Sequence, residues 1–347
     1  MKKLRFFDST LRDGSHAIKH SLSKQTIADY CEKMDKAGME VIIVGHGNGL
    51  GASSLQGGLS TLSDREMLET AREHLNKTLL GAFLTTGYGT IKDDLIPALD
   101  IGVELVCIAC HCTEANVARQ YIEYVKHKDK IAFGVLLMYH MAETQTIINE
   151  ALKMQSYGAD GIIIMDTAGA STPQLVSRTI RYLKQNLSIR IGFHPHNNLG
   201  MAVGNAYIAY ENGVDIIDGT IRGFGAGAGN CQLEAFIALL QKLEIKTDVD
   251  LFRLLDVGEQ IIDPIWSNGK GLSSLSIVSG MSGINSTFGT HVNKAAKIYN
   301  VDPKTIFIEL GKLKVVGGQE DMVVDVAMNL AQLLKEDITE DIISSLL

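Results

Sequence analysis

Short apolar runs recur along the first two thirds of the chain, and amphipathic stretches separate them. The runs are mostly continuous rather than alternating, which is typical of strands that are buried on both faces. Alternation of strands and helices favours parallel pairing, and it predicts an α/β fold, either a (β/α)8 TIM barrel or a doubly wound sheet. Eight runs are assigned as strands, at residues 4–7, 41–44, 79–84, 105–109, 131–137, 161–165, 189–193 and 214–217.

Polar residues follow nearly every predicted strand, and their placement favours the barrel. In a barrel these strand ends share one rim, which is where active sites of this fold lie. We therefore predict a TIM barrel over residues 1–250 with a site at that rim. The polar clusters are residues 8–13, 46–48, 111–114, 139–140, 166–167, 194–198 and 218–220.

The alternation of strands and helices ends at about residue 247, and from there the sequence shows helical patterns without further convincing strands. We predict a C-terminal helical domain over residues 251–347. Its amphipathic helices suit contact either with a partner protein or with a second copy of the chain in a homo-oligomer.

Composition narrows the classes of function. Hydrophobic residues make up 46% of the 347 residues and the net charge is -8, so no basic face is expected and nucleic acid is excluded as a partner. No apolar stretch reaches the roughly 18 residues that a membrane span needs, and the start turns polar too early for a signal peptide. We expect a cytoplasmic enzyme that acts on a small molecule.

The cysteines could in principle bind zinc. There are five, an odd count that suits a reducing compartment better than a disulfide framework, and Cys107, Cys110 and Cys112 lie in "CIACHC". This segment has strand character, which sends alternate side chains to opposite faces, and no second ligand cluster has matching spacing. We interpret these cysteines as small core residues.

Residues 194–198 read "HPHNN" after an apolar run. Residues two apart on a strand face the same way, so His194 and His196 can point together into the barrel mouth. Two histidines and one carboxylate form a recurrent open metal site, and the carboxylate could come from Asp13, Asp166 or Asp218. The alternative is two histidines with unrelated hydrogen-bond partners.

The end of the first strand supplies the stretch "DSTLRDGSHAIKH". Arg12, Asp13 and His16 put a cation, a carboxylate and an imidazole within reach of one small ligand. Charged loop residues are often only solvated, but this combination at a barrel rim has no evident packing role.

The stretch "GFGAGAGN", residues 223–230, suggests a dinucleotide-binding loop. Its glycines fall at two-residue intervals and it follows the eighth strand, so neither the spacing nor the place of that motif is met. Close approach of the backbone to the substrate, or tight packing at the rim, explains the glycines better.

The chain resembles the 4-hydroxy-2-oxovalerate (4-hydroxy-2-oxoacid) aldolases. These are class II pyruvate aldolases of the metal-dependent barrel superfamily that includes isopropylmalate synthase and hydroxymethylglutaryl-CoA lyase. The resemblance covers nearly the whole chain and is carried by "TLRDGSHAIKH", "HGNGLGASS", "HCTEAN", "HNNLGMAVGNA", "GFGAGAGN" and "VGGQEDMVVDVA".

The resemblance implies a divalent metal, with Mn favoured and Mg or Co also fitting, bound by Asp13, His194 and His196. It implies that Arg12 steadies the enolate of pyruvate and that His16 takes the proton of the 4-hydroxyl group. Thr167 and His194 are expected to contact the substrate, and Asn230 is expected to support the metal or bind it.

The resemblance fails on the side of the site that would hold the aldehyde. Met281 and Asn285 stand where the family has tyrosines, and Ile43 stands where relatives have a glutamate near Arg12. The stretch "LTTG", residues 84–87, is also less apolar than its family counterpart. We therefore expect cleavage or formation of a 4-hydroxy-2-oxoacid whose aldehyde differs from acetaldehyde.

Two other functions stay open. A Claisen-type condensing enzyme or acyl-CoA lyase could use the same metal residues. A non-catalytic subunit could dock on an acylating aldehyde dehydrogenase, which the resemblance implies as a partner, but docking does not require Arg12, His16 and three metal ligands.

Overall fold

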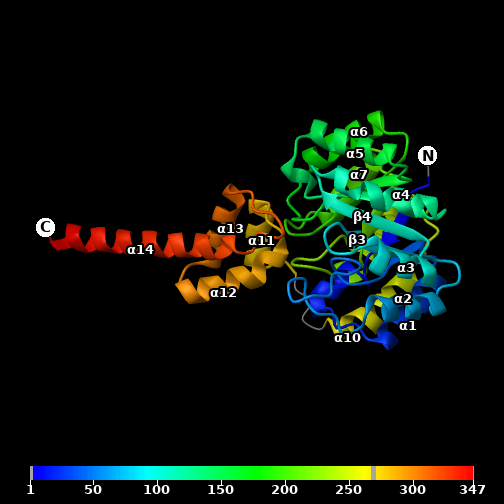
Figure 1. Ribbon diagram of the computed structural model, residues 1–347, viewed down its shortest axis with the longest axis horizontal. Coiled ribbons are helices and arrows are strands. Elements are labelled where there is room, and N and C mark those ends of the chain that lie inside the picture. Colours follow the sequence, from blue (N-terminus) through cyan, green and yellow to red (C-terminus); the bar gives the residue numbers. More distant parts are fainter. Residues whose placement is uncertain (1–2, 267–270, 347) are drawn as a thin grey trace.

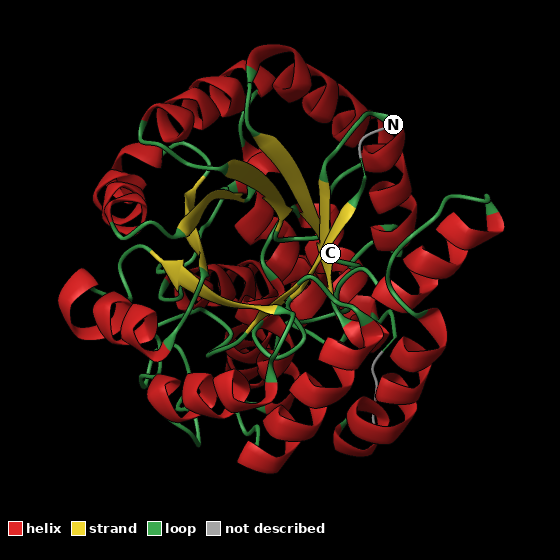
Figure 2. Ribbon diagram, turned by 90° about the vertical axis from the view of Figure 1, so that its right-hand side faces the viewer, coloured by secondary structure: helices red, strands yellow, loops and turns green. Residues whose placement is uncertain are grey.

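Eight parallel strands close into a barrel in their order along the chain, and helices surround it (Figure 2). The computed structural model describes residues 3–266 and 271–346. Each predicted run overlaps one strand, so the TIM barrel is confirmed and the doubly wound sheet is wrong. The strands are β1 (Arg5–Asp8), β2 (Val41–Ile43), β3 (Leu79–Thr85), β4 (Leu105–His111), β5 (Ile131–Leu137), β6 (Gly161–Asp166), β7 (Arg190–Pro195) and β8 (Ile216–Gly219).

One α-helix follows each strand, and these eight helices cover the outside of the barrel (Figure 1). Their ends follow local rules: Thr172 caps α6 through its side chain with Pro173 next, and α1 ends at Gly38 with φ 80°. The helices are α1 (Lys24–Ala37), α2 (Asp64–His74), α3 (Ile96–Ile101), α4 (Arg119–His127), α5 (Thr144–Ser156), α6 (Pro173–Asn186), α7 (Ala202–Glu211) and α8 (Leu233–Lys242).

Strand β4 shows how the barrel makes two apolar layers. Leu105 and Cys107 belong to the cluster inside the barrel, whereas Val106 and Cys110 belong to the cluster between strands and helices. Cys107 and Cys110 therefore lie on opposite faces and cannot share a zinc ion with Cys112. Burial raises the pKa of the Cys110 and Cys112 thiols to about 12, as expected for inert core residues.

The same set of contacts occurs four times at the end of the barrel opposite the rim where the site is predicted. An acidic residue stands immediately before each even-numbered strand, and its backbone carbonyl accepts a hydrogen bond from the first residue of an odd-numbered strand. Each acid also pairs with a basic side chain, so the same contact recurs around this end. The pairs are Glu40–Arg5, Glu104–Arg72, Asp160–Lys126 and Asp215–Lys184.

The predicted C-terminal helices are confirmed, and those after residue 271 enclose their own apolar cluster, which includes Phe288, Val292 and Phe307. Helix α14 extends away from the rest of the molecule (Figure 1). In the described ranges no helix is both long and apolar enough to cross a membrane. The helices of this region are α11 (Ser274–Ser282), η7 (Ser286–Phe288), α12 (Gly289–Tyr299), α13 (Pro303–Lys312) and α14 (Met322–Leu346).

Three short helices connect the two regions: α9 (Leu251–Val257), η6 (Gly258–Ile262) and α10 (Asp263–Ile265). Leu254 and Ile262 contribute to the apolar layer around the barrel. These helices therefore pack with the barrel, and the division of the chain at residue 250 stays a prediction.

Candidate metal centre

The loop after β1 turns sharply and carries the predicted residues Arg12, Asp13 and His16. The carbonyl of Ser9 accepts hydrogen bonds from the backbone N–H groups of Arg12 at 3.0 Å and Asp13 at 2.8 Å. The short helix η1 (Asp13–Ile18) begins at this turn. The turn thus directs two adjacent charged side chains toward the rim of the barrel.

The carboxylate of Asp8 anchors the same loop. Its Oδ1 accepts a hydrogen bond from the Thr10 backbone N–H at 2.9 Å, and the Tyr30 hydroxyl donates to Oδ2 at 2.6 Å. The Thr10 hydroxyl in turn accepts from the backbone N–H of Ile221, which follows β8. Burial raises the pKa of Asp8 to about 6, so these donors hold a carboxyl group that is costly to ionise.

Asp13, His194 and His196 form a group that could hold a metal ion. One side-chain ligand atom from each lies within 4.8 Å of the others, and all three residues are buried. In the described part of the chain this is the one such group of three or more acidic, histidine or cysteine residues. Two imidazole nitrogens and one carboxylate oxygen suit a divalent ion with open positions. The fold brings together the two histidines and the first of the three carboxylates considered.

The other two carboxylates have different neighbours. The Nδ1 atom of His194 donates to Asp218 Oδ2 at 2.8 Å, so Asp218 orients a possible ligand rather than joining the group. Asp166 accepts hydrogen bonds from the backbone N–H groups of Ala170 at 3.0 Å and Ser171 at 3.1 Å. Asp166 therefore shapes the loop that follows β6.

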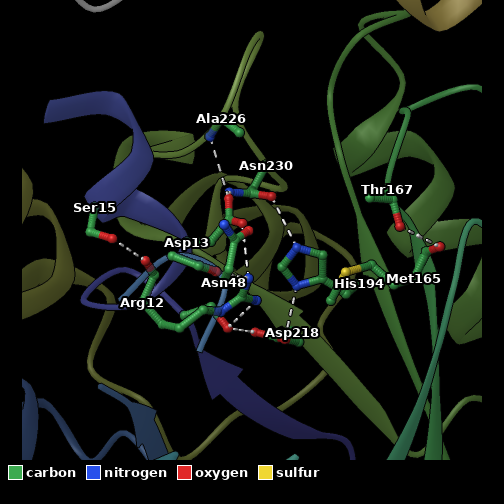
Figure 3. A network of polar contacts seen from close by, with 12 residues as sticks. Arg12, Asp13, Ser15, Asn48, Met165, Thr167, His194, Asp218, Ala226 and Asn230 are labelled. Carbon is green, nitrogen blue, oxygen red and sulfur yellow. Dashed lines mark hydrogen bonds and ion pairs between the residues drawn. The ribbon is translucent and has the colours of Figure 1, made fainter. Parts of the chain in front are cut away.

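A closed ring of polar contacts joins Asp13, His194 and Asp218 to Arg12, Ser9 and Asn230 (Figure 3). Ser9, which sequence reasoning did not single out, donates to Asp218 and accepts from Arg12. Because every member has two neighbours in the ring, a shift of one side chain strains the others. The contacts are Asp13–Arg12 at 2.9 Å, Arg12–Ser9 at 3.3 Å, Ser9–Asp218 at 2.8 Å, Asp218–His194 at 2.8 Å, His194–Asn230 at 3.0 Å and Asn230–Asp13 at 2.6 Å.

The charges of the group suit a metal ligand set. Burial alone would raise the pKa of Asp13, but the nearby Arg12 and the imidazoles hold that pKa well below its usual range. Burial lowers the pKa of His196 to about 4, so its imidazole is neutral at pH 7. An ionised carboxylate and a neutral imidazole are the forms that bind metals.

One nitrogen of the Arg12 side chain has no hydrogen-bond partner among the described residues. Its guanidinium lies over the Phe83 ring at 4.3 Å and donates to Asp13 and Ser9, yet its buried Nε atom has no hydrogen-bond partner among the described residues. A buried donor without a partner in a polar site is a position where a ligand oxygen can bind.

His16 lies against Gly47, in the loop after β2. A Cβ atom on Gly47 would lie 2.3 Å from His16 Nε2, so only glycine leaves room for this imidazole. Burial lowers the pKa of His16 to about 4, which keeps the ring neutral at pH 7. His20 and His46, to which the sequence assigned no individual role, stack at 3.7 Å beside it. Their signal was the presence of two further histidines in the same two rim loops.

Thr167 lies outside the ring. Its hydroxyl oxygen accepts a hydrogen bond from the Met138 backbone N–H at 3.0 Å, and Figure 3 shows Thr167 on the far side of His194 from Asp13. The expected contact between Thr167 and the substrate stays a prediction.

The glycine-rich stretch after β8 folds directly over the group. A Cβ atom on Gly225 would lie 2.0 Å from Asn230 Nδ2 and 2.5 Å from Asp13 Oδ2, so the backbone here touches the site. Gly227 and Gly229 have φ of 61° and 84°, which other residues rarely adopt. These contacts favour the packing interpretation of the stretch over a dinucleotide-binding loop.

Three altered family positions, Ile43, Met281 and Asn285, have ordinary structural surroundings. Ile43 is fully buried in the apolar cluster inside the barrel. Asn285 accepts a hydrogen bond from the Thr287 backbone N–H at 3.1 Å and so caps η7, and Met281 is 63% exposed.

Comparison with known proteins identifies the family. A model described as HMGL-like matches residues 3–261, and one described as a DmpG-like communication domain matches residues 271–332. A 4-hydroxy-2-oxovalerate aldolase of Spirochaeta aurantia is 48% identical over 93% of this chain and 95% of its own length. Another, from Pectobacterium atrosepticum, is 47% identical over 95% of this chain and 96% of its own.

Solved structures agree on the fold. The carboxyl transferase domain from Rhizobium etli pyruvate carboxylase superposes with a TM-score of 0.79 over 96% of this chain and 61% of that chain, at 17% identity. At this identity the likeness shows the barrel fold alone. The relatives above reach much higher identity over nearly their full length, and the chain belongs to the family of 4-hydroxy-2-oxovalerate aldolases, with an HMGL-like barrel and a DmpG-like communication domain.

Proposed function

We propose that the protein cleaves a 4-hydroxy-2-oxoacid to pyruvate and an aldehyde, or forms it from them, and that the reaction depends on a divalent metal. One observation carries this proposal: Asp13, His194 and His196 converge beside the free donor of Arg12 at the barrel rim. Carbon–carbon lyase activity also agrees with the names of the relatives. Those names favour neither the Claisen-type reaction nor a purely docking role.

The three proposed ligands fit a divalent ion. They supply two nitrogens and one oxygen, they are buried, and Asp218 orients His194 through Nδ1. When bound, the ion would act as a Lewis acid that stabilises negative charge on the 2-oxo oxygen. We propose Mn, with Mg or Co as substitutes, because mixed nitrogen and oxygen ligands with open positions suit six-coordinate ions.

Arg12 is proposed to hold the pyruvyl end of the substrate. Breaking the bond between C3 and C4 sends its electron pair into the C2–C3 bond, which gives an enolate. A fixed guanidinium in a buried site stabilises this charge without reorganising. Its contacts with Asp13 and Phe83 keep it in place.

His16 is proposed to accept the proton of the 4-hydroxyl group as the aldehyde leaves. The lowered pKa keeps the imidazole neutral at pH 7 and able to take a proton. A proton from solvent then adds to C3 of the enolate to give pyruvate, and His16 releases its proton to solvent, so the atoms and charges balance. Thr167 and His194 are proposed as further substrate contacts.

The aldehyde is proposed to be larger or more polar than acetaldehyde. This rests on Asn285 and Met281 standing where the family has tyrosines, and on Thr85 in the stretch at the end of β3. The Thr85 hydroxyl donates to the Asn48 carbonyl at 2.8 Å, which makes that part of the rim polar.

We also propose that an acylating aldehyde dehydrogenase is the partner of the C-terminal domain. The match to a communication domain supports this, and exposed apolar residues on that domain, including Met281 and Met328, offer contact area. A homo-oligomer and a cytoplasmic location stay predictions.

The test is release of pyruvate from a panel of 4-hydroxy-2-oxoacids by the full chain with added Mn²⁺. We expect release from at least one compound, with slower turnover of the one that yields acetaldehyde. Failure of every compound, with the metal shown to be bound, would overturn the proposal. Release of free thiol from acetyl-CoA under the same conditions would instead support the Claisen-type reaction.

A further inference from the structure

A turn of the second domain rests on the barrel rim beside the proposed metal centre. The turn joins α11 to η7 at residues 283–286, and α11 faces the barrel in Figure 1. Loops after β5, β7 and β8 all reach it. The His140 Nε2 atom lies 3.2 Å from the Gly283 carbonyl oxygen, and Asn198 and Gly227 make the other two contacts.

Asn198 makes the most enclosed of these contacts. It is fully buried, and its Nδ2 atom donates to Ser286 Oγ at 2.6 Å. Gly169 and Gly280 both pack closely against Asn198. A Cβ atom on Gly169 would lie 2.6 Å from the Asn198 backbone nitrogen, and one on Gly280 would lie 2.8 Å from Asn198 Cβ. Asn198 follows His196 by two residues, so the tightly held amide and the proposed ligand move as one segment.

Ser286 also touches the loop on the other side of the centre. A Cβ atom on Gly227 would lie 2.3 Å from Ser286 Oγ. Two residues earlier, Gly225 packs on Asp13 Oδ2, and the Ala226 backbone N–H points to the same oxygen at 3.4 Å. One hydroxyl of the second domain therefore contacts both loops that border the proposed ligands.

We propose that Ser286 and Asn198 are a positioning pair that couples the helical domain to the metal centre. A shift of the turn moves the His196 segment and the glycine-rich loop together, because a close-packed contact transmits displacement instead of absorbing it. Metal affinity then depends on the state of the second domain. This inference rests on the proposed function of Asp13, His194 and His196.

The chemistry of the contact supports a coupling role. A surface that served only to join the two regions could be apolar and would leave no polar atom without a partner. Here the buried Asn198 Oδ1 atom has no hydrogen-bond partner among the described residues. Such an atom costs stability, and polar groups that are kept at a cost concentrate where they have a function.

The test uses Ser286→Ala, Asn198→Ala and the double variant in the full chain. Ser274→Ala, on the exposed start of α11, is the matched control. Binding of Mn²⁺ to the metal-stripped proteins is measured by calorimetry, the Mn²⁺ electron spin resonance spectrum is recorded, and thermal unfolding is followed.

Each single variant is expected to bind Mn²⁺ about 3- to 30-fold more weakly and to change the spectrum, whereas the control matches the parent. The double variant is expected to bind Mn²⁺ no more weakly than the weaker single variant, because each change alone already removes the hydrogen bond between Asn198 and Ser286. If Asn198→Ala does not fold, Ser286→Ala carries the test.

A lower melting temperature with unchanged Mn²⁺ affinity would show a merely structural contact and overturn the inference, as would additive effects. If the parent protein binds Mn²⁺ and releases pyruvate, and the variants bind Mn²⁺ as tightly as the parent, only the coupling is overturned. A parent that binds no Mn²⁺ would overturn the proposed function as well.

Discussion

The Nδ1 atom of His194 donates a hydrogen bond to Asp218 Oδ2 over 2.8 Å, and this contact turns the other ring nitrogen toward Asn230 and Asp13. A carboxylate behind a ligand imidazole fixes its tautomer and raises its basicity. The relationship makes Asp218 part of the proposed metal centre although it does not belong to the ligand group.

Asp218→Asn should therefore weaken metal binding. The variant keeps the shape of the side chain but removes its charge, and loss of such a partner costs about 10- to 100-fold in metal affinity. Calorimetric titration with Mn²⁺ measures the effect, and circular dichroism checks the fold. An affinity equal to that of the parent would mean that Asp218 only packs.

His196→Ala should abolish both metal retention and pyruvate release. The residue supplies one of three proposed ligand atoms, and the two left would hold an ion far more weakly. His291→Ala, an exposed histidine on α12, is the control and should behave as the parent. Turnover by the His196 variant without bound metal would refute the ligand assignment.

Arg12→Lys should lower kcat by about 100-fold or more while Mn²⁺ still binds. A lysine keeps the charge but cannot reproduce the planar donors that contact Asp13 and Ser9 and leave Nε free. Loss of one donor to a developing oxyanion costs about 100- to 1,000-fold. Steady-state kinetics with separate kcat and KM decide, and a change in KM alone would point to simple substrate binding.

Gly47→Ala should reduce turnover and leave metal affinity nearly intact. The new methyl group would lie 2.3 Å from His16 Nε2 and displace the proposed base without touching the ligand group. Gly289→Ala, where nothing lies within 4 Å, is the matched control. Equal loss of metal and activity in the Gly47 variant would show that the loop matters for the metal instead.

Stability should fall as the pH drops from about 6.5 toward 3, partly because of His20. Burial lowers its pKa in the folded protein to about 3, whereas the unfolded chain takes up the proton near 6.5. The unfolded state therefore binds more protons than the folded state in this pH window. By pH 5 this group lowers the free energy of unfolding by about 2 kcal/mol.

The variant His20→Asn tests this pH dependence. His20 has φ 57°, a conformation that asparagine tolerates. The difference in unfolding free energy between pH 7.5 and pH 5 should be smaller in the variant than in the parent, as measured by urea titration. An identical difference would show that other groups account for the whole pH dependence.

Most of the barrel could be predicted from the sequence because buried parallel strands leave continuous apolar runs. Nearly every run, for example 161–165, is followed by polar residues of the rim, and the barrel closes as expected. His194, His196 and Asp13 could be paired because strand ends meet at one rim. The choice among three carboxylates could not be made from spacing, since it depends on how the loop turns at Ser9.

Contacts between distant segments were beyond sequence reasoning. Asn198 and Ser286 are 88 residues apart, and no periodicity links them. The stacking of His20 on His46 could not be predicted either, because it depends on the positive φ of His20, which no sequence motif indicates.

Asp13, His194 and His196 are proposed to hold a divalent ion that the cleavage needs. The most direct measurement strips the full chain of metal and titrates Mn²⁺ back while both bound metal and pyruvate release from 4-hydroxy-2-oxoacids are recorded. The proposal predicts that activity rises in step with one Mn²⁺ per chain in the parent and stays absent in His196→Ala. Full pyruvate release by the stripped protein, or equal Mn²⁺ binding by the variant, would contradict it.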